Sequence, residues 1–147
     1  MLGFGMGGGL ALARAASGFD IAAVHTGQLS KNLEATLTDP RPLVGSYGAR
    51  DRYARGAAAI LKGALGLAGV AHDTVEYHDA GHAFKNDAPV GPRALGPLLK
   101  VAGMVPEPTA ASEVWRHTEE FFVPQLVNDR WATRTHRDLD DTCRRGP

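Results

Sequence analysis

The chain begins MLGFGMGGG, residues 1–9, and this stretch is the most informative part of the sequence. The apolar residues 1–4 have the pattern of a short buried strand, and they stop at a glycine cluster. Residues 9–17 are rich in alanine and leucine and are followed by Gly18, which is typical of a helix closed by a glycine. We therefore expect a strand, a tight glycine turn and a helix at the start of the chain.

The segments that follow repeat this order of strand and helix. Residues 21–25 and 43–47 are continuous apolar runs, a pattern typical of strands that are covered on both faces. Residues 74–77 alternate polar and apolar side chains, as expected of a strand near the edge of a sheet. The link over residues 29–37 is predicted to be a short helix or irregular.

Two longer helices are also predicted. The first covers residues 53–68 and ends where Gly69 can serve as a C-terminal cap, and its expected buried face consists of Ile60, Leu61, Ala64, Leu65 and Ala68. The second begins near Pro108 and Thr109, and its expected buried face consists of Val114, Trp115, Thr118, Phe121 and Phe122. We expect these aromatic side chains, and Tyr77, to lie in the core.

Strands separated by helices predict the α/β class, with a parallel sheet and helices on both of its faces. One domain is expected over residues 1–126. Residues 127–147 are predicted to be a polar, disordered tail, because their charged side chains leave almost no apolar face. These charged residues are Asp129, Arg130, Arg134, Arg137, Asp138, Asp140, Asp141, Arg144 and Arg145.

Length and charge exclude several classes of protein. The 147 residues match one ordinary domain, and 16 basic side chains balance 16 acidic ones, so the composition offers no overall basic field for nucleic acid. The single cysteine, Cys143, cannot form an intramolecular disulfide or a cysteine-rich zinc site, which is compatible with a cytoplasmic protein. No apolar run is long enough to span a membrane, and the glycine-rich start without a basic residue is interpreted as mature sequence.

The glycine cluster itself, residues 3–8, is open to three interpretations. It fits the G-x-G-x-x-G pattern of a dinucleotide-binding turn, although the second strand ends in His25 and lacks the acidic residue that would hold a ribose. It also fits a nucleophile elbow, the sharp strand-to-helix turn of many hydrolases, with Gly5 at the nucleophile position. A glycine-rich connection without chemistry is the third possibility.

Two further residues give the elbow interpretation more weight. Asp51 follows the predicted strand 43–47, and His82 follows the predicted strand 74–77. Open parallel sheets place their sites at the carboxyl ends of the strands, where Gly5 is also expected. The order of nucleophile position, acid and histidine along the chain is the order found in α/β-hydrolases.

These blocks, GFGMGGG at residues 3–9, GARD at 48–51 and GHAF at 81–84, together with Trp115, Phe121 and Phe122, resemble the dienelactone hydrolase family up to about Phe122. The resemblance implies the α/β-hydrolase fold and the hydrolysis of lactones and other esters by a Cys- or Ser-His-Asp triad, without a cofactor or a metal. A small ester or lactone is the implied partner, with no nucleic acid and no membrane involved.

The resemblance also assigns roles to four residues. Asp51 would orient the imidazole of His82 and stabilise its charge, and His82 would be the general base. The backbone N–H of Met6 would be one donor of the oxyanion hole. Gly5 stands where the family has cysteine or serine, so we expect this chain to be inactive or poorly active.

The family also has several strands before the elbow, so we expect a partial fold that lacks them, with the first strand unpaired along one edge. That edge predicts self-association. Other interpretations of the site stay open: Asp51 as a helix-start residue, His82 as an ordinary loop histidine, and Arg14, Arg50, Arg52 and Arg55 as an anion site or as plain surface. The spacing of His72, His78 and His82 matches no zinc pattern.

Three functions are therefore carried forward. The chain is a dienelactone hydrolase-type esterase with an incomplete triad, a non-catalytic relative that binds a small ligand beside His82 and Asp51, or a nucleotide-binding domain that uses residues 3–8.

Overall fold

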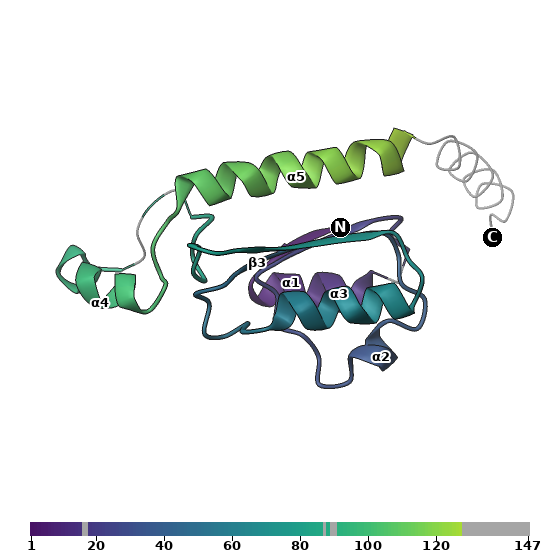
Figure 1. The fold of residues 1–147 in the computed structure, drawn as a ribbon, viewed down its shortest axis with the longest axis horizontal. Helices are drawn as coiled ribbons and strands as arrows, with labels where there is room; N and C mark the ends of the chain where they lie inside the picture. Colours follow the sequence, from purple (N-terminus) through teal and green to yellow (C-terminus); the bar gives the residue numbers. More distant parts are fainter. Residues whose placement is uncertain (16–17, 87, 89–90, 128–147) are drawn as a thin grey trace, which may run out of the picture.

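The computed structural model describes residues 1–15, 18–86, 88 and 91–127. Its described strands form one parallel sheet in the order β1-β2-β3-β4 (Figure 1). They are β1 (Leu2–Phe4), β2 (Ala22–His25), β3 (Leu43–Gly48) and β4 (His72–Tyr77). The register pairs Phe4 with His25 and His25 with Ser46, so the carboxyl ends of β1, β2 and β3 lie together at one edge of the sheet.

Helices cover both faces of this sheet (Figure 1). Helices α1 (Met6–Arg14) and α3 (Ala57–Leu67) lie on one face, and the long α5 (Pro108–Val127) crosses the other. The short elements α2 (Leu33–Thr36), η1 (Arg93–Leu95) and α4 (Gly96–Val101) lie in the connections. The predicted α/β class, with a parallel sheet between layers of helices, is confirmed.

The main core lies between the sheet and the pair α1 and α3. Tyr47, Leu12, Leu43, Leu61 and Leu65 are among its largest fully buried side chains. Each such side chain contributes about 1.5–3 kcal/mol by its removal from water. A smaller cluster of Ala80, Phe84, Ala110 and Val114 lies beneath α5, with Tyr77 packed against it as expected.

The predicted buried face of α3 is wrong at two positions, Ile60 and Ala68. Ala68 is exposed and is the C-terminal cap of the helix. Ile60 is 58% exposed, and the buried residues of the helix are Ala57, Ala58, Leu61 and Leu65. Ile60 lies one residue, or about 100°, from the line through Leu61 and Leu65, so it falls outside the buried face of the helix. Gly69 has the predicted capping conformation, with φ of +66°.

The predicted face of α5 also needs correction. Its buried residues are Ala110, Val114 and Thr118, spaced four apart, and the Thr118 hydroxyl donates to the Val114 carbonyl at 2.7 Å. Trp115 is 50% exposed, and Phe121 and Phe122 are only partly buried. These aromatic rings lie beside the buried line, so they flank the core instead of filling it.

Strand β1 lies at one edge of the described sheet and pairs with β2 alone. The ammonium group of Met1 donates to the Ile21 carbonyl at 2.7 Å, which fixes the start of the strand against its neighbour. Leu2 and Phe4 remain 38% and 42% exposed. Helix α5 includes Val127, and the rest of the predicted tail, 128–147, lies outside the described residues. No described helix is long and apolar enough to cross a bilayer.

Candidate active site

The turn between β1 and α1 places Gly5 in a strained backbone conformation. Its φ is +51° and its ψ is −118°, a combination that L-amino acids with side chains rarely adopt. The Gly5 N–H donates to the His25 carbonyl at 2.9 Å, and the Gly5 carbonyl accepts from the N–H of Gly8 at 3.0 Å. The backbone therefore makes a sharp, hydrogen-bonded turn at the residue where an elbow would present its nucleophile.

Close packing explains two glycines near this turn. A Cβ at Gly3 would lie 2.1 Å from the Gly7 carbonyl oxygen, and a Cβ at Gly8 would lie 2.8 Å from the Cα of Gly27. A Cβ at Gly7 would meet nothing within 4 Å. The elbow pattern predicts close approaches at Gly3 and Gly7, but the second one occurs at Gly8, where α1 crosses the end of β2.

Asp51 and His82 are directly paired. The Nδ1 atom of His82 is 2.7 Å from the Oδ2 atom of Asp51, and the Oδ1 atom of Asp51 accepts the backbone N–H of Tyr53 at 2.8 Å. The Asp51 side chain is 1% exposed. This geometry holds the imidazole in one orientation, with Nε2 pointing away from the carboxylate. The interpretation of Asp51 as a helix-start residue is wrong, because α3 begins only at Ala57.

The free nitrogen of His82 faces the turn at Gly5. A Cβ built at Gly5 would lie 3.9 Å from the Nε2 atom of His82, in ordinary van der Waals contact. One further bond, to an oxygen or a sulfur, would bring a side chain at position 5 within hydrogen-bonding reach of the imidazole. The fold thus brings together Gly5, Asp51 and His82, which lie up to 77 positions apart in the sequence. Their proximity was predicted from their places at the ends of the strands.

Met6 is the first residue of α1. Its backbone N–H belongs to the first turn, where helices have no internal acceptor and carry a partial positive charge. That position suits the oxyanion donor implied by the sequence, although the Met6 side chain itself is 86% exposed.

A cavity of about 460 Å³ adjoins this group of residues. Its wall combines the turn at Gly5, the loop after β4 and helix α5. The lining residues are Phe4, Gly5, Thr26, His82, Ala83, Lys85, Asn86, Met104 and Trp115. The exposed flank of Trp115 on α5 therefore forms a wall of the cavity, and a small ligand there would meet both polar groups and aromatic rings.

Thr26 is a second strained residue of this cavity, and the sequence patterns did not single it out. Among the residues that the structure describes, Thr26 is the one non-glycine residue with a positive φ. Its φ of +52° is unusual for a β-branched side chain. Its hydroxyl donates to the His25 carbonyl at 2.7 Å, and its N–H donates to the Ser46 carbonyl at 2.8 Å. These bonds hold the end of β2 in its bent conformation beside Gly5.

Two buried bases near the cavity were also missed. His25 is completely buried, and its pKa is lowered to about 3 by burial and by the nearby Lys85 and His117. Burial likewise lowers the pKa of Lys85 to about 6. The burial of His25 agrees with the predicted strand 21–25, which was expected to be covered on both faces, but nothing in the sequence indicated a titratable group at this cavity. Lys85 follows the GHAF block, and its position carried no signal of burial.

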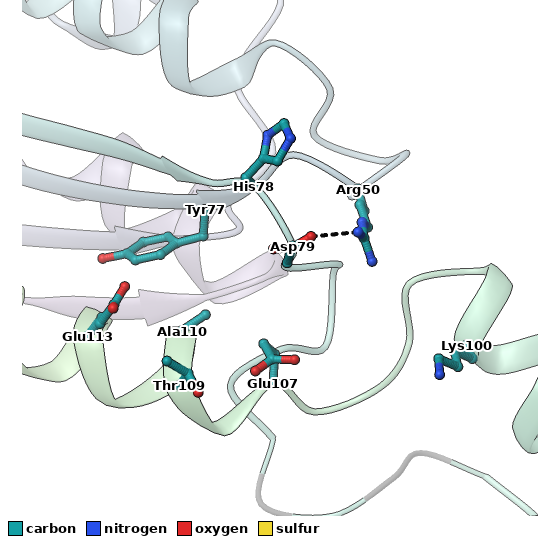
Figure 2. Close-up of a pocket in the computed structure, with 9 residues that line it drawn as sticks. All are labelled: Arg50, Tyr77, His78, Asp79, Lys100, Glu107, Thr109, Ala110 and Glu113. Atoms are coloured by element: carbon teal, nitrogen blue, oxygen red, sulfur yellow. Dashed lines mark hydrogen bonds and ion pairs between the residues drawn. The ribbon is translucent and has the colours of Figure 1, made fainter.

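A second, more polar cavity of about 600 Å³ lies on the other side of the loop after β4 (Figure 2). Arg50 and Asp79 form an ion pair of 2.6 Å there, and the pair is exposed, so it contributes little to stability. Because Asp79 neutralises Arg50, this arginine is not available as the anion site considered above. Glu107 and Glu113 also line the cavity, which further disfavours an anion.

The histidines near β4 do not converge. His72 bonds the Val70 carbonyl through Nδ1 at 2.8 Å, His78 lines the second cavity, and His82 is paired with Asp51. Among the residues that the structure describes, no three His, Cys, Asp or Glu side chains are placed to hold a metal ion.

Comparison with known proteins identifies a family. The model of the dienelactone hydrolase family matches residues 1–126. A structure described as a candidate dienelactone hydrolase from Klebsiella pneumoniae subsp. pneumoniae is 22% identical, with a TM-score of 0.63 over 82% of this chain and 50% of the other. An alpha/beta hydrolase enzyme from a Medee basin deep-sea metagenome library is 12% identical, with a TM-score of 0.53 over 82% of this chain and 52% of the other.

These structural neighbours show the α/β-hydrolase fold, and the chain spans about half of their length. No curated protein matches the sequence.

Proposed function

The chain belongs to the dienelactone hydrolase family, and we propose that its cavity beside Gly5 is an ester- or lactone-binding site in which hydrolysis is slow because position 5 has no nucleophilic side chain. The observation that carries this proposal is the alignment of Asp51, His82 and position 5. Asp51 pairs with Nδ1 of His82 at 2.7 Å, and Nε2 of the same ring faces the position of a Cβ at Gly5 at 3.9 Å.

Each retained group has a chemical role in this proposal. The buried Asp51 carboxylate fixes the His82 tautomer and stabilises the imidazolium that forms when His82 accepts a proton. The Met6 N–H, at the start of α1, is placed to stabilise the oxyanion of a substrate carbonyl. Position 5 has no hydroxyl or thiol, so the remaining nucleophile for an ester carbonyl carbon is water. Water is not held in place as a side-chain nucleophile would be.

Hydrolysis of 4-nitrophenyl acetate tests the proposal. We expect the chain to hydrolyse it at a rate close to that of buffer. Gly5→Cys, in a Cys143→Ser background, should release about one equivalent of nitrophenolate in a rapid burst, because the thiol is acylated after His82 takes its proton. The same variant with His82→Ala should lose the burst and is the matched control. A burst that does not need His82, or a chain that already turns over through His82, would overturn the proposal.

A non-catalytic ligand-binding relative is the second candidate, and it is favoured by the open space that Gly5 leaves in front of His82. It separates from the first in the same experiment, because a pure binding site would give no burst in the Gly5→Cys variant. The dinucleotide-binding interpretation has less support, since β2 ends in His25, where an acidic side chain would hold the ribose. Under that interpretation a dinucleotide would raise the melting temperature.

The expected partners and location belong to this proposal as well. A small uncharged or weakly polar ester or lactone fits a cavity lined by Phe4 and Trp115. The single cysteine supports a reducing, cytoplasmic setting.

A further inference from the structure

Lys85 is an amine in the same cavity that the proposed function does not use. It lies three residues after His82, in the turn that follows β4, and it lines the cavity together with Gly5 and Phe4. Its Nζ atom is buried and has no hydrogen-bond partner among the described residues. Most lysines keep their ammonium group in water, so a buried amine without a partner needs an explanation.

The surroundings of this amine are aromatic. Nζ lies 4.5 Å from the centre of the Phe4 ring and 5.3 Å from that of Phe84. Two rings attract an ammonium ion, but such contacts do not replace the hydrogen bonds that a charged group loses when it is buried. This desolvation lowers the pKa of Lys85 from 10.5 to about 6. At neutral pH the amine is therefore uncharged in most molecules, and its nitrogen carries a free lone pair.

Among the residues that the structure describes, the charged and titratable neighbours of Lys85 include no counter-ion for its ammonium group. His25, at the end of β2, faces Lys85 and is itself unprotonated, with both ring nitrogens lacking a partner among the described residues. His117, on α5, lies near His25 and is paired with Asp73 at 2.5 Å. His82, in the same turn, is paired with Asp51. The described residues around Nζ are thus basic or apolar, and none of those that line the cavity is acidic.

We propose that Lys85 is a nucleophilic amine that captures small aromatic aldehydes or ketones in this cavity as a reversible imine. The Nζ lone pair attacks the carbonyl carbon, and a proton moves from nitrogen to the carbonyl oxygen to give a carbinolamine. Loss of that hydroxyl as water leaves the C=N bond, so one carbonyl and one amine give one imine and one water. Phe4 and Trp115 offer stacking surfaces for an aromatic substituent.

Reductive trapping tests this on the full chain. The protein is incubated with benzaldehyde and sodium cyanoborohydride at pH 7, and the benzylated residues are mapped by mass spectrometry. Lys31, Lys62 and Lys100 are exposed and serve as internal controls. We expect Lys85 to be modified at least tenfold faster than any of them, because an ordinary lysine is almost fully protonated at this pH. Equal or slower modification of Lys85 would overturn the proposal.

Two further measurements keep the test independent of mutagenesis. Between pH 7 and pH 9 the rate at Lys85 should change less than threefold, while the rate at Lys62 should rise about tenfold for each pH unit. In urea concentrations that unfold the chain, the preference for Lys85 should vanish. A parallel rise at both lysines, or a preference that survives unfolding, contradicts a site built by the fold. Because the readout is an adduct on Lys85, it is separate from the ester burst that tests the proposed function.

Discussion

At the end of β2, the buried imidazole of His25 packs against the rings of Phe4 and Trp115, with centroid separations of 5.1 and 6.3 Å. Neither ring nitrogen has a hydrogen-bond partner among the described residues. In the neutral ring one nitrogen is a donor and the other an acceptor, so both lose hydrogen bonds to water on folding. The burial of His25 therefore lowers the stability of the folded chain, and the size of this loss depends on pH.

The sign of that dependence follows from the lowered pKa. The unfolded chain binds a proton at His25 below about pH 6.5, and the folded chain binds it only near pH 3. Stability is therefore lost as the pH falls from 6.5 toward 3. We expect His25→Leu to remove this loss: between pH 7 and pH 5 the natural chain should lose about 2 kcal/mol more than the variant.

Urea unfolding of both proteins at the two pH values measures the difference. The two proteins share all their other titrating groups, so the comparison isolates position 25. Parallel losses of stability would show that His25 is protonated in the folded state, and the account of its burial would then be wrong.

The sequence predicts some residues of the site well and others not at all. Gly5, Asp51 and His82 are found because each directly follows a strand, and parallel strands bring their carboxyl ends together. His25 is expected to be buried as part of the strand 21–25, but its place in the site is not found, and neither are Thr26 and Lys85. The positive φ of Thr26 accompanies a bond to Ser46 on the next strand, and Lys85 Nζ lies over the ring of Phe4, about 80 positions earlier. No local pattern encodes such contacts between distant segments.

At the scale of elements, the junction of β1 and α1 depends on a contact between backbones. Gly3 has no room for a Cβ, which would lie 2.1 Å from the Gly7 carbonyl oxygen, whereas Gly7 faces open space. Gly3 lies in β1 and Gly7 lies four residues later in the first turn of α1, so they make a matched pair for mutagenesis on the two sides of the junction.

We expect Gly3→Ala to lower the free energy of unfolding by roughly 3 kcal/mol, because either the strand or the helix must move. Gly7→Ala should raise it by about 0.5–1 kcal/mol, because alanine is favoured over glycine inside a helix. Thermal or urea unfolding of both variants provides the measurement. Similar effects at the two positions would contradict the packing described for this turn.

The elements themselves differ in how far sequence predicts them. The strands and the helices α1, α3 and α5 have apolar runs or periodic faces, and they are found where those patterns lie. The elements η1 and α4 have no buried residues, so they carry no periodic signal and were not predicted. The faces of α3 and α5 were each misassigned in part, because which side of a helix is buried depends on where it crosses the sheet.

At the scale of the whole molecule, β1 presents a partly exposed, apolar edge. Among the described strands it pairs with β2 alone, and the side chains of Leu2 and Phe4 are more than a third exposed. Unpaired edges of this kind associate with other strands. We therefore propose that the chain self-associates at tens of micromolar, and that Leu2→Lys shifts it toward the monomer.

Size-exclusion chromatography with light scattering measures this directly. The variant adds a charge to the edge without removing a core residue, so it is expected to stay folded. A natural chain that is monomeric throughout this concentration range would contradict the proposal.

The central claim is that the fold sets position 5 against the His82–Asp51 pair. It is tested most directly by the pH dependence of alkylation by iodoacetamide in Gly5→Cys, with Cys143→Ser as background and His82→Ala as the comparison. A thiol beside this imidazole should react with a midpoint at least one pH unit below the usual value of about 8.5, and the midpoint should return to about 8.5 when His82 is removed. Identical profiles with and without His82 would contradict the account.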